Sequence, residues 1–454
     1  MCTVLQKTPD LSTAKVTDLI RKFALPAIMS SLVGSIYNIA AQIFVGQKLG
    51  TAGNAATNVA FPLVLLMVTF SMMIGSGGAS KFSLHQGAGE NRNAGKTIGN
   101  AIISLAASGI LLMLLTLLFL RPMMILFGAK GETLELATAY TQITAIGIPF
   151  YIMGTGCSMY VRADGSPKYA MASTITGAVL NIIFDPILIF VLDMGIRGAA
   201  IATVAGQVAS AIITVLYMRR FKSIQLQKEH FSPDIKIISD ILTLGLPSGM
   251  MQIAVMLVQI VMNNTLGHYG ELSPYGRDIP LAVAGIVSKV STIFNSVIMG
   301  ICQSCQPIFG YNHGAGSYKR VKEAYKQAAV IVTLVSSIAF LLFQLMPHQI
   351  LEIFQQGNDL YLEFGTTYLR IFMFAIFLNG IQILTANFFP SIGNAKKGMI
   401  ASLSRQVLFQ LPLILILPLF IGLNGILFAG PIADTAACAL SFTLIRKEFR
   451  NADS

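Results

Sequence analysis

The feature that most limits the fold of this chain is a series of long apolar runs. A helix needs about 20 apolar residues to cross the roughly 30 Å hydrocarbon core of a bilayer. Twelve runs of this kind occur, joined by mostly short polar connections. They lie near residues 23–46, 54–80, 97–120, 138–160, 169–192, 198–218, 240–265, 281–306, 327–346, 365–387, 402–421 and 424–445. The pattern predicts an all-α polytopic membrane protein with twelve transmembrane helices.

Composition excludes the soluble classes. Of 454 residues, 54% are hydrophobic and only 11% are charged, against roughly 25% charged in soluble domains. So few charges cannot cover a soluble surface, and so many apolar residues are incompatible with disorder. No stretch is charge-rich enough to form a separate soluble domain.

The net charge of +11 is best explained by membrane orientation. If both termini lie inside, the inner segments hold 24 Lys and Arg residues and the outer loops hold five. Cytoplasmic loops of membrane proteins carry such an excess. We therefore expect a multi-pass protein of the bacterial inner (plasma) membrane with both termini cytoplasmic, in contact with the lipid bilayer and with no nucleic-acid partner.

The two halves of the chain resemble each other. Gly87-Ala88-Gly89 recurs as Gly314-Ala315-Gly316, and Gly198 recurs as Gly425, both at an offset of 227 residues. Each half then contains six spans, so the repeats are parallel and related by a pseudo-two-fold axis along the membrane normal. The prediction is two pseudo-symmetric six-helix lobes, residues 1–225 and 240–454, joined by a cytoplasmic linker at 226–239. Rocking of one lobe against the other would give alternating access to a central cleft.

Several segments together resemble the multidrug and toxin extrusion (MATE) family, over essentially the whole chain and in its bacterial drug-efflux branch. They are IYNIAAQIFVGQKLG at 36–50, HQGAGENRNAGK at 85–96, RADGSPKYAMASTITGAVLNIIFDPILIF at 162–190, GIRGAAIATVAGQ at 195–207, SIGNAKKG at 391–398 and GLNGILFAGPIAD at 422–434. The resemblance implies a secondary active antiporter that exports amphipathic, often cationic drugs or metabolites in exchange for H+ or Na+. It also implies two six-helix lobes around a central cavity.

A carboxylate within the fifth span is the first candidate for ion coupling. Asp185 and Asn181 are four residues apart, so both side chains share one face of a helix. An ionised carboxylate at that depth costs at least about 2.5–3.5 kcal/mol, so it needs a proton, a cation or a positive partner. Pro186 cannot donate a backbone hydrogen bond and is expected to loosen the helix. In the family that the chain resembles, these positions and Thr203 in the sixth span form the cation or proton site. The alternative is that Asn181 and Asp185 bond only to neighbouring helices.

The first span departs from the family pattern. The family commonly has an acid five positions before the glycine of Phe44-Val45-Gly46, where this chain has Ala41. A site with one carboxylate holds Na+ less tightly than a site with two, because hard cations prefer several oxygen ligands, so the sequence favours proton coupling. Neighbouring Asn38 and Gln42 could contact substrate or simply pack between helices.

In the second half, the candidate cavity residues are Gln259, Asn263, Lys289 and Gln303. Lys289 stands in the apolar run LAVAGIVSKVSTIF and is expected to be buried. A buried lysine lines a cavity or pairs with an acid, for which Asp434 is a candidate. Snorkelling to an interface is the alternative.

No motif points to an enzyme. The chain has no phosphate-binding loop, and its five His and five Cys residues show no catalytic or metal-ligand pattern. We expect no cofactor besides the coupling ion, no bound metal cofactor and a monomer acting on a small-molecule substrate. A flippase for lipid-linked oligosaccharides, a distant relative of related architecture, is the alternative function. It is disfavoured because pyrophosphate recognition uses many arginines, and basic residues within the spans are few.

Overall fold

The computed structural model describes residues 11–353 and 359–453, so residues 1–10 of the predicted first lobe and residues 354–358 and 454 of the second lie outside it. The described residues form helices and connecting turns, without strands. The first lobe consists of α1 (Val16–Gly87), α2 (Asn91–Leu118), α3 (Leu120–Leu126), α4 (Gly131–Ala163), α5 (Pro167–Pro186), the π-helix η1 (Ile187–Val191) and α6 (Gly195–Met218). The second consists of α7 (Ile235–Glu271), α8 (Asp278–Gly314), α9 (Tyr318–Leu345), α10 (Pro347–Glu352), α11 (Asp359–Phe372), α12 (Ile376–Ser391), α13 (Ala395–Leu403), the π-helix η3 (Ser404–Gln410), α14 (Leu411–Ile416), α15 (Pro418–Ile421) and α16 (Leu423–Asp453).

The predicted twelve spans are confirmed. Eleven helices of the described ranges are long and apolar enough to cross a membrane, and α11 and α12, bent by 51° at the break between them, form the twelfth. The helix α1 holds the first two spans, which meet at Gly50 with φ of 61°. Glycine adopts this left-handed conformation without steric cost, so the chain reverses there with almost no loop.

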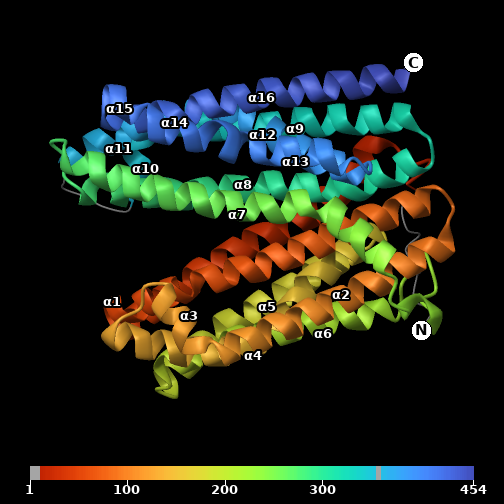
Figure 1. Ribbon diagram of the computed structural model, residues 1–454, viewed down its shortest axis with the longest axis horizontal. Coiled ribbons are helices and arrows are strands. Elements are labelled where there is room, and N and C mark those ends of the chain that lie inside the picture. Colours follow the sequence, from red (N-terminus) through yellow and green to blue (C-terminus); the bar gives the residue numbers. More distant parts are fainter. Residues whose placement is uncertain (1–10, 354–358, 454) are drawn as a thin grey trace.

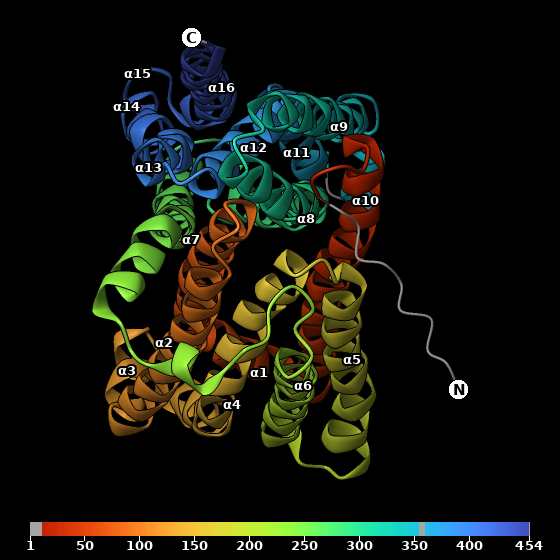
Figure 2. The same cartoon turned by 90° about the vertical axis from the view of Figure 1, so that its right-hand side faces the viewer.

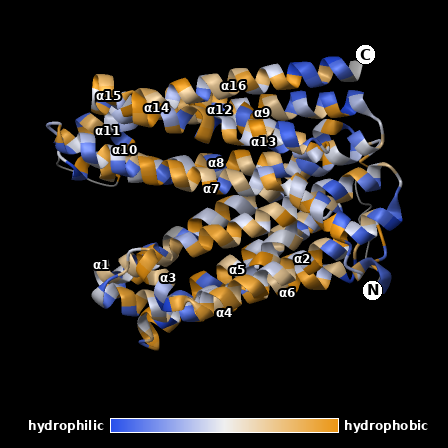
Figure 3. Ribbon diagram, in the orientation of Figure 1, coloured by the Kyte–Doolittle hydropathy of each residue, from blue (hydrophilic) through white to orange (hydrophobic). Residues whose placement is uncertain are grey.

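The two lobes lie side by side and are splayed apart at one end (Figure 1). The start of α1 and the end of α16 lie at the opposite end, where the lobes meet (Figure 1). Hydrophobic residues occupy the middle of the helices, and hydrophilic residues gather near their ends (Figure 3). This distribution matches a bilayer whose two surfaces cut across the ends of both lobes.

The first turns of α1 pack against the second lobe. Leu19 and Phe23 are fully buried in a cluster that also contains Phe309 of α8 and Phe388 of α12. In the end-on view, this part of α1 lies beside α9, while the rest of α1 returns to the first lobe (Figure 2). The first helix therefore belongs to the cores of both lobes at the end where they meet.

The segment between the lobes packs on the first of them. It contains the short 3-10 helix η2 (Lys228–Phe231), and α7 begins at Ile235, inside the range 226–239 expected for the linker. The side chain of Asn100 on α2 accepts a hydrogen bond from the backbone N–H of Asp234 at 2.7 Å and donates one to the carbonyl oxygen of Ser232 at 3.1 Å. The connection is thus held against α2 before it enters α7.

Candidate functional site

The structure brings the three predicted coupling residues together. Asn181 and Asp185 on α5 are buried, with 2% and 1% of their surfaces exposed, and Thr203 lies on the neighbouring α6. With its nitrogen toward the carboxylate, the Asn181 amide donates to Oδ2 of Asp185 at 3.2 Å and accepts from the backbone N–H of Thr203 at 3.2 Å. The Thr203 hydroxyl donates to the carbonyl oxygen of Ala199 at 2.9 Å.

One carboxylate oxygen of Asp185 is left without a partner. Oδ1 is buried and has no hydrogen bond from any described residue. Such an oxygen has lost its hydrogen bonds to water without gaining one from the protein, which is unfavourable by its full desolvation free energy. A proton on the carboxylate or a cation beside it would remove that cost, so the atom is suited to bind either.

The backbone changes its geometry directly after this carboxylate. Pro186 ends α5, and the helix continues as the π-helix η1. A proline removes one donor from the helical ladder, and π-helical turns are frequently found at functional sites. The loosening expected at Pro186 is therefore present as a local change of helix type.

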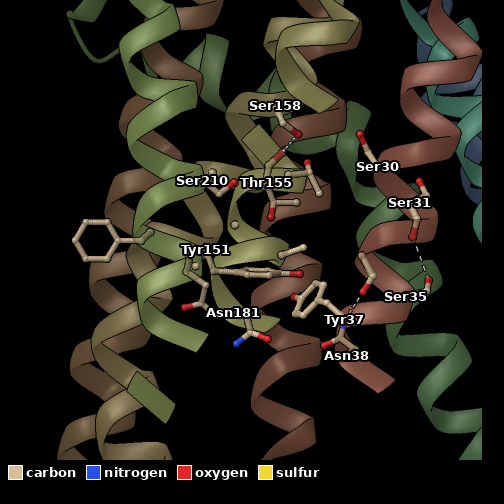
Figure 4. A pocket seen from close by; sticks show the side chains of 18 of the residues that line it. Ser30, Ser31, Ser35, Tyr37, Asn38, Tyr151, Thr155, Ser158, Asn181 and Ser210 are labelled. Atoms are coloured by element: carbon tan, nitrogen blue, oxygen red, sulfur yellow. Dashed lines mark hydrogen bonds between the residues drawn. The ribbon is translucent and has the colours of Figure 1, made fainter. Parts of the chain in front are cut away.

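Above this group lies a cavity of about 370 Å³ in the first lobe, the N-lobe cavity, with Asn181 and Thr203 in its wall. Its walls are rich in hydroxyl groups from α1 and α4. Figure 4 shows Tyr37 of α1 and Tyr151 of α4 close to Asn181, with serines of α1 facing Thr155 and Ser158 of α4. Asp185 does not line the cavity and is linked to it by its hydrogen bond with Asn181. Of the other predicted residues, Asn38 and Gln303 line this cavity.

A second cavity, of about 380 Å³, occupies the other lobe and is called here the C-lobe cavity. Its wall includes Gln259, four methionines and several amides. Three buried amide oxygens in the wall, of Asn379, Gln382 and Gln410, have no hydrogen-bond partner among the described residues. Unpaired buried acceptors favour water or a ligand that carries donor groups. Gln303 also lines a narrow cavity between the lobes, together with Met72 and Met251.

Comparison with known proteins decides the family. The MatE family model matches residues 26–187 and 247–416, one stretch in each lobe and well over half of the chain. This chain is a member of the MATE family. It is therefore a membrane transporter and not an enzyme.

The relatives and solved structures agree with this assignment. The multidrug export protein MepA of Staphylococcus aureus strain MSSA476 is 26% identical over 424 residues, covering 93% of this chain and 92% of MepA. A crystal structure of a MATE protein in complex with MaL6 superposes with a TM-score of 0.92 at 22% identity, over 98% of this chain and 99% of that one. The outward-facing conformation of a multidrug resistance MATE transporter superposes with a TM-score of 0.91 at 22% identity, with the same coverage of both chains.

Three predicted cavity residues are not in the walls of the cavities described above. Within the described residues, Gln42, Asn263 and Lys289 are exposed and line none of these cavities. Asn263 accepts a hydrogen bond from Gln259 at 2.9 Å, one helical turn away. The expectation that Lys289 is buried was wrong, because its side chain is exposed although its sequence neighbours are apolar.

The partner expected for Asp434 also differs. Asp434 is 3% exposed and forms an ion pair with the side chain of Arg405, which lines the C-lobe cavity. Arg405 stands in the π-helix η3. Sequence spacing did not reveal this pair, because 29 residues and a change of helix separate its members.

Proposed function

We propose that this MATE transporter is an antiporter that exports amphipathic, often cationic, organic compounds in exchange for H+ or Na+. It does so from the bacterial inner membrane, as a monomer with both termini cytoplasmic. The names of its relatives support the substrate class. The excess of inner positive charge supports the orientation. In this orientation the lobes meet at the cytoplasmic end and are splayed at the outer end, so the conformation is outward-facing.

The observation that carries the coupling proposal is the unpaired Oδ1 of Asp185, buried behind the wall of the N-lobe cavity. Binding of a proton or cation neutralises the buried carboxylate, and substrate competes for the same region of the cavity. Asn181 holds the carboxylate in place and is itself held by the backbone N–H of Thr203. Protons are favoured over Na+ because the first span supplies Ala41 where a second acid would stand. Access then alternates as one lobe rocks against the other.

The test is export of ethidium from proteoliposomes with a pH gradient or a Na+ gradient imposed separately. Asp185→Asn keeps the size and polarity of the side chain but removes its charge. It should abolish gradient-driven export and leave ethidium binding to the purified protein within about twofold. Asp278→Asn is the matched control, because Asp278 is exposed at the start of α8. Export by Asp185→Asn at the unmutated rate under both gradients would place the coupling site elsewhere.

A further inference from the structure

Arg162 is a buried cation without a counter-charge. It stands in the last turn of α4 with 8% of its surface exposed, and it lines the N-lobe cavity. Its guanidinium makes no hydrogen bond and no ion pair with any described residue. Buried charges in proteins are normally paired, so an unpaired arginine in a cavity wall indicates a partner that binds from outside the chain.

The acid nearest to Arg162 in the sequence is used elsewhere. Asp164, two residues further on, accepts hydrogen bonds on Oδ2 from the Tyr217 hydroxyl and the Lys222 backbone N–H, both at 2.7 Å, and on Oδ1 from the Ser223 N–H at 2.9 Å. Asp185 does not line the cavity and is hydrogen-bonded to Asn181. Among the described residues that line the N-lobe cavity, Arg162 is the one charged side chain. The carboxyl-terminal dipole of α4 offsets only part of that charge.

The position of Arg162 is set by a stripe along α4. Tyr151, Thr155, Ser158 and Arg162 are spaced by four, three and four residues, so they share one helix face, and all four line the cavity. At a rise of 1.5 Å per residue, Arg162 lies about 16 Å along the helix axis from Tyr151. The cavity is therefore polarised, with the guanidinium at its inner end and Asn181, backed by Asp185, near Tyr151.

We propose that Arg162 binds the carboxylate of organic acids and zwitterions in the N-lobe cavity. A guanidinium offers two parallel donors that match a carboxylate, and desolvation in the cavity strengthens that contact. The hydroxyl groups along α4 and α1 accommodate the uncharged middle of such a compound. This inference rests on the proposed function, since it takes the N-lobe cavity to be part of the export route. It assigns to Arg162 the recognition of an anionic group on a substrate.

The test compares two dyes that differ at a single group. Rhodamine 110 has a free carboxylate, and rhodamine 123 is its cationic methyl ester. Binding of each to the purified protein in nanodiscs is measured by fluorescence anisotropy. Arg162→Gln should weaken binding of rhodamine 110 by about tenfold or more and leave rhodamine 123 bound as tightly as before or more tightly. Arg162→Lys, which keeps the charge but loses the planar fork, should have an intermediate effect.

Arg219→Gln is the matched control, because Arg219 is an exposed arginine at the same end of the first lobe. It should change neither dye. Equal weakening of both dyes by Arg162→Gln, or no change in either, would overturn the proposal and leave Arg162 a structural residue. If Arg162→Gln does not fold, competition on the unmutated protein decides. Naphthoate should displace rhodamine 110 at lower concentration than naphthamide does, and equal displacement would overturn the proposal. These are binding measurements, so a failure of ion-coupled export would leave their outcome unaffected.

Discussion

Gly245 of α7 lies directly against the backbone of Met73 in α1, so that a Cβ atom at Gly245 would overlap the Met73 carbonyl oxygen. One turn away, a Cβ atom at Gly77 would overlap the carbonyl oxygen of Ile241 in the same manner. Two helices of different lobes thus touch backbone to backbone at the end where the lobes meet. Only glycine, which has no Cβ atom, permits this approach.

The first prediction is that Gly245→Ala opens this end. Inserting a methyl group into such a contact costs about 1–3 kcal/mol, and the cost falls only on the conformation in which the lobes touch. The population should move toward lobes separated at this end. Double electron–electron resonance between spin labels at Arg92 and Lys319, exposed residues on the two lobes, should show a longer distance.

The control for that experiment is Gly285→Ala. Gly285 is a helical glycine in α8 with no atom within 4 Å of a Cβ placed on it. Its substitution should leave the distance distribution unchanged. Identical distributions for Gly245→Ala and Gly285→Ala would show that the glycine contact does not control opening.

The second prediction concerns Arg320, which ties the start of the chain to the second lobe. Its Nη2 donates to the carbonyl oxygens of Ala14 at 2.7 Å and Leu11 at 3.1 Å, and its Nε donates to Oδ1 of Asn312 at 2.9 Å. Hydrogen bonds from a charged group contribute about 1.5–3 kcal/mol each. Arg320→Gln should therefore speed amide hydrogen exchange in residues 11–20 by at least tenfold.

Lys319→Gln tests whether charge alone explains that effect. Lys319 is the exposed neighbour of Arg320, and its loss should leave exchange in residues 11–20 as it is. Equal exchange in both variants would mean that packing of Leu19 and Phe23 alone holds this segment.

Much of the fold could be predicted because it depends on properties that repeat along the chain. Apolar length predicted the spans, and the repeat predicted two lobes. The start of the second lobe was less predictable, since α7 begins at Ile235 within a polar stretch, where Asp234 caps the helix by accepting from the N–H groups of Lys236 and Ile237. The glycine contacts between α1 and α7 could not be read from the sequence, because they depend on the register of two helices.

The candidate site was also predictable only in part. Asn181 and Asp185 share a helix face by spacing, so their pairing was predictable, and the family resemblance added Thr203. Arg162 was missed because it follows a long apolar run and precedes a polar turn, so it looked like a loop charge on the inner side. Its burial results from tertiary packing, which hydropathy does not report. Lys289 shows the opposite error, since an apolar neighbourhood in sequence did not mean a buried side chain.

The third prediction is that Asp164→Asn releases the segment after α6. The carboxylate is an acceptor at both oxygens, whereas asparagine presents a donor at one of them. At least one of the N–H groups of Lys222 and Ser223 then faces another donor, at a cost of about 1–3 kcal/mol. Trypsin should cleave after Lys222 faster than in the unmutated protein. Glu229→Gln, an exposed change in the same segment, should not alter cleavage, and equal rates for both variants would contradict the proposed anchoring.

The fourth prediction is a small pH dependence at the opposite end of the first lobe. The Lys48 ammonium lies 2.6 Å from Oδ1 of Asp193 and holds the pKa of that carboxyl below its usual range. A carboxyl with a lowered pKa stabilises the fold above its unfolded pKa of about 3.9, and the contribution is lost as pH falls through the folded pKa. Asp193→Asn should lower the Tm slightly at pH 7, and this deficit should shrink and disappear as the pH falls through the lowered folded pKa. Asparagine tolerates the φ of 52° at this position, so a Tm deficit that persists in acid would show that the ion pair is not its cause.

The last prediction concerns Ala41, where the family commonly has an acid. Ala41 is half-buried and follows Tyr37 and Asn38 by four and three residues, so it extends the face of α1 that lines the N-lobe cavity. A carboxylate there would add oxygen ligands on the side of the cavity facing α5, and two carboxylates attract a hard cation more strongly than one. Ala41→Asp should therefore allow a Na+ gradient alone to drive ethidium export. It should also raise the Tm in NaCl relative to choline chloride, as a ligand that binds only the folded state does. Ala41→Asn has the same shape without the charge and should do neither. If Ala41→Asp and Ala41→Asn respond to Na+ alike, the carboxylate of Asp185 is too far from position 41 to share a cation with it. Proton coupling at Asp185 would then not depend on whether the first span carries an acid at position 41.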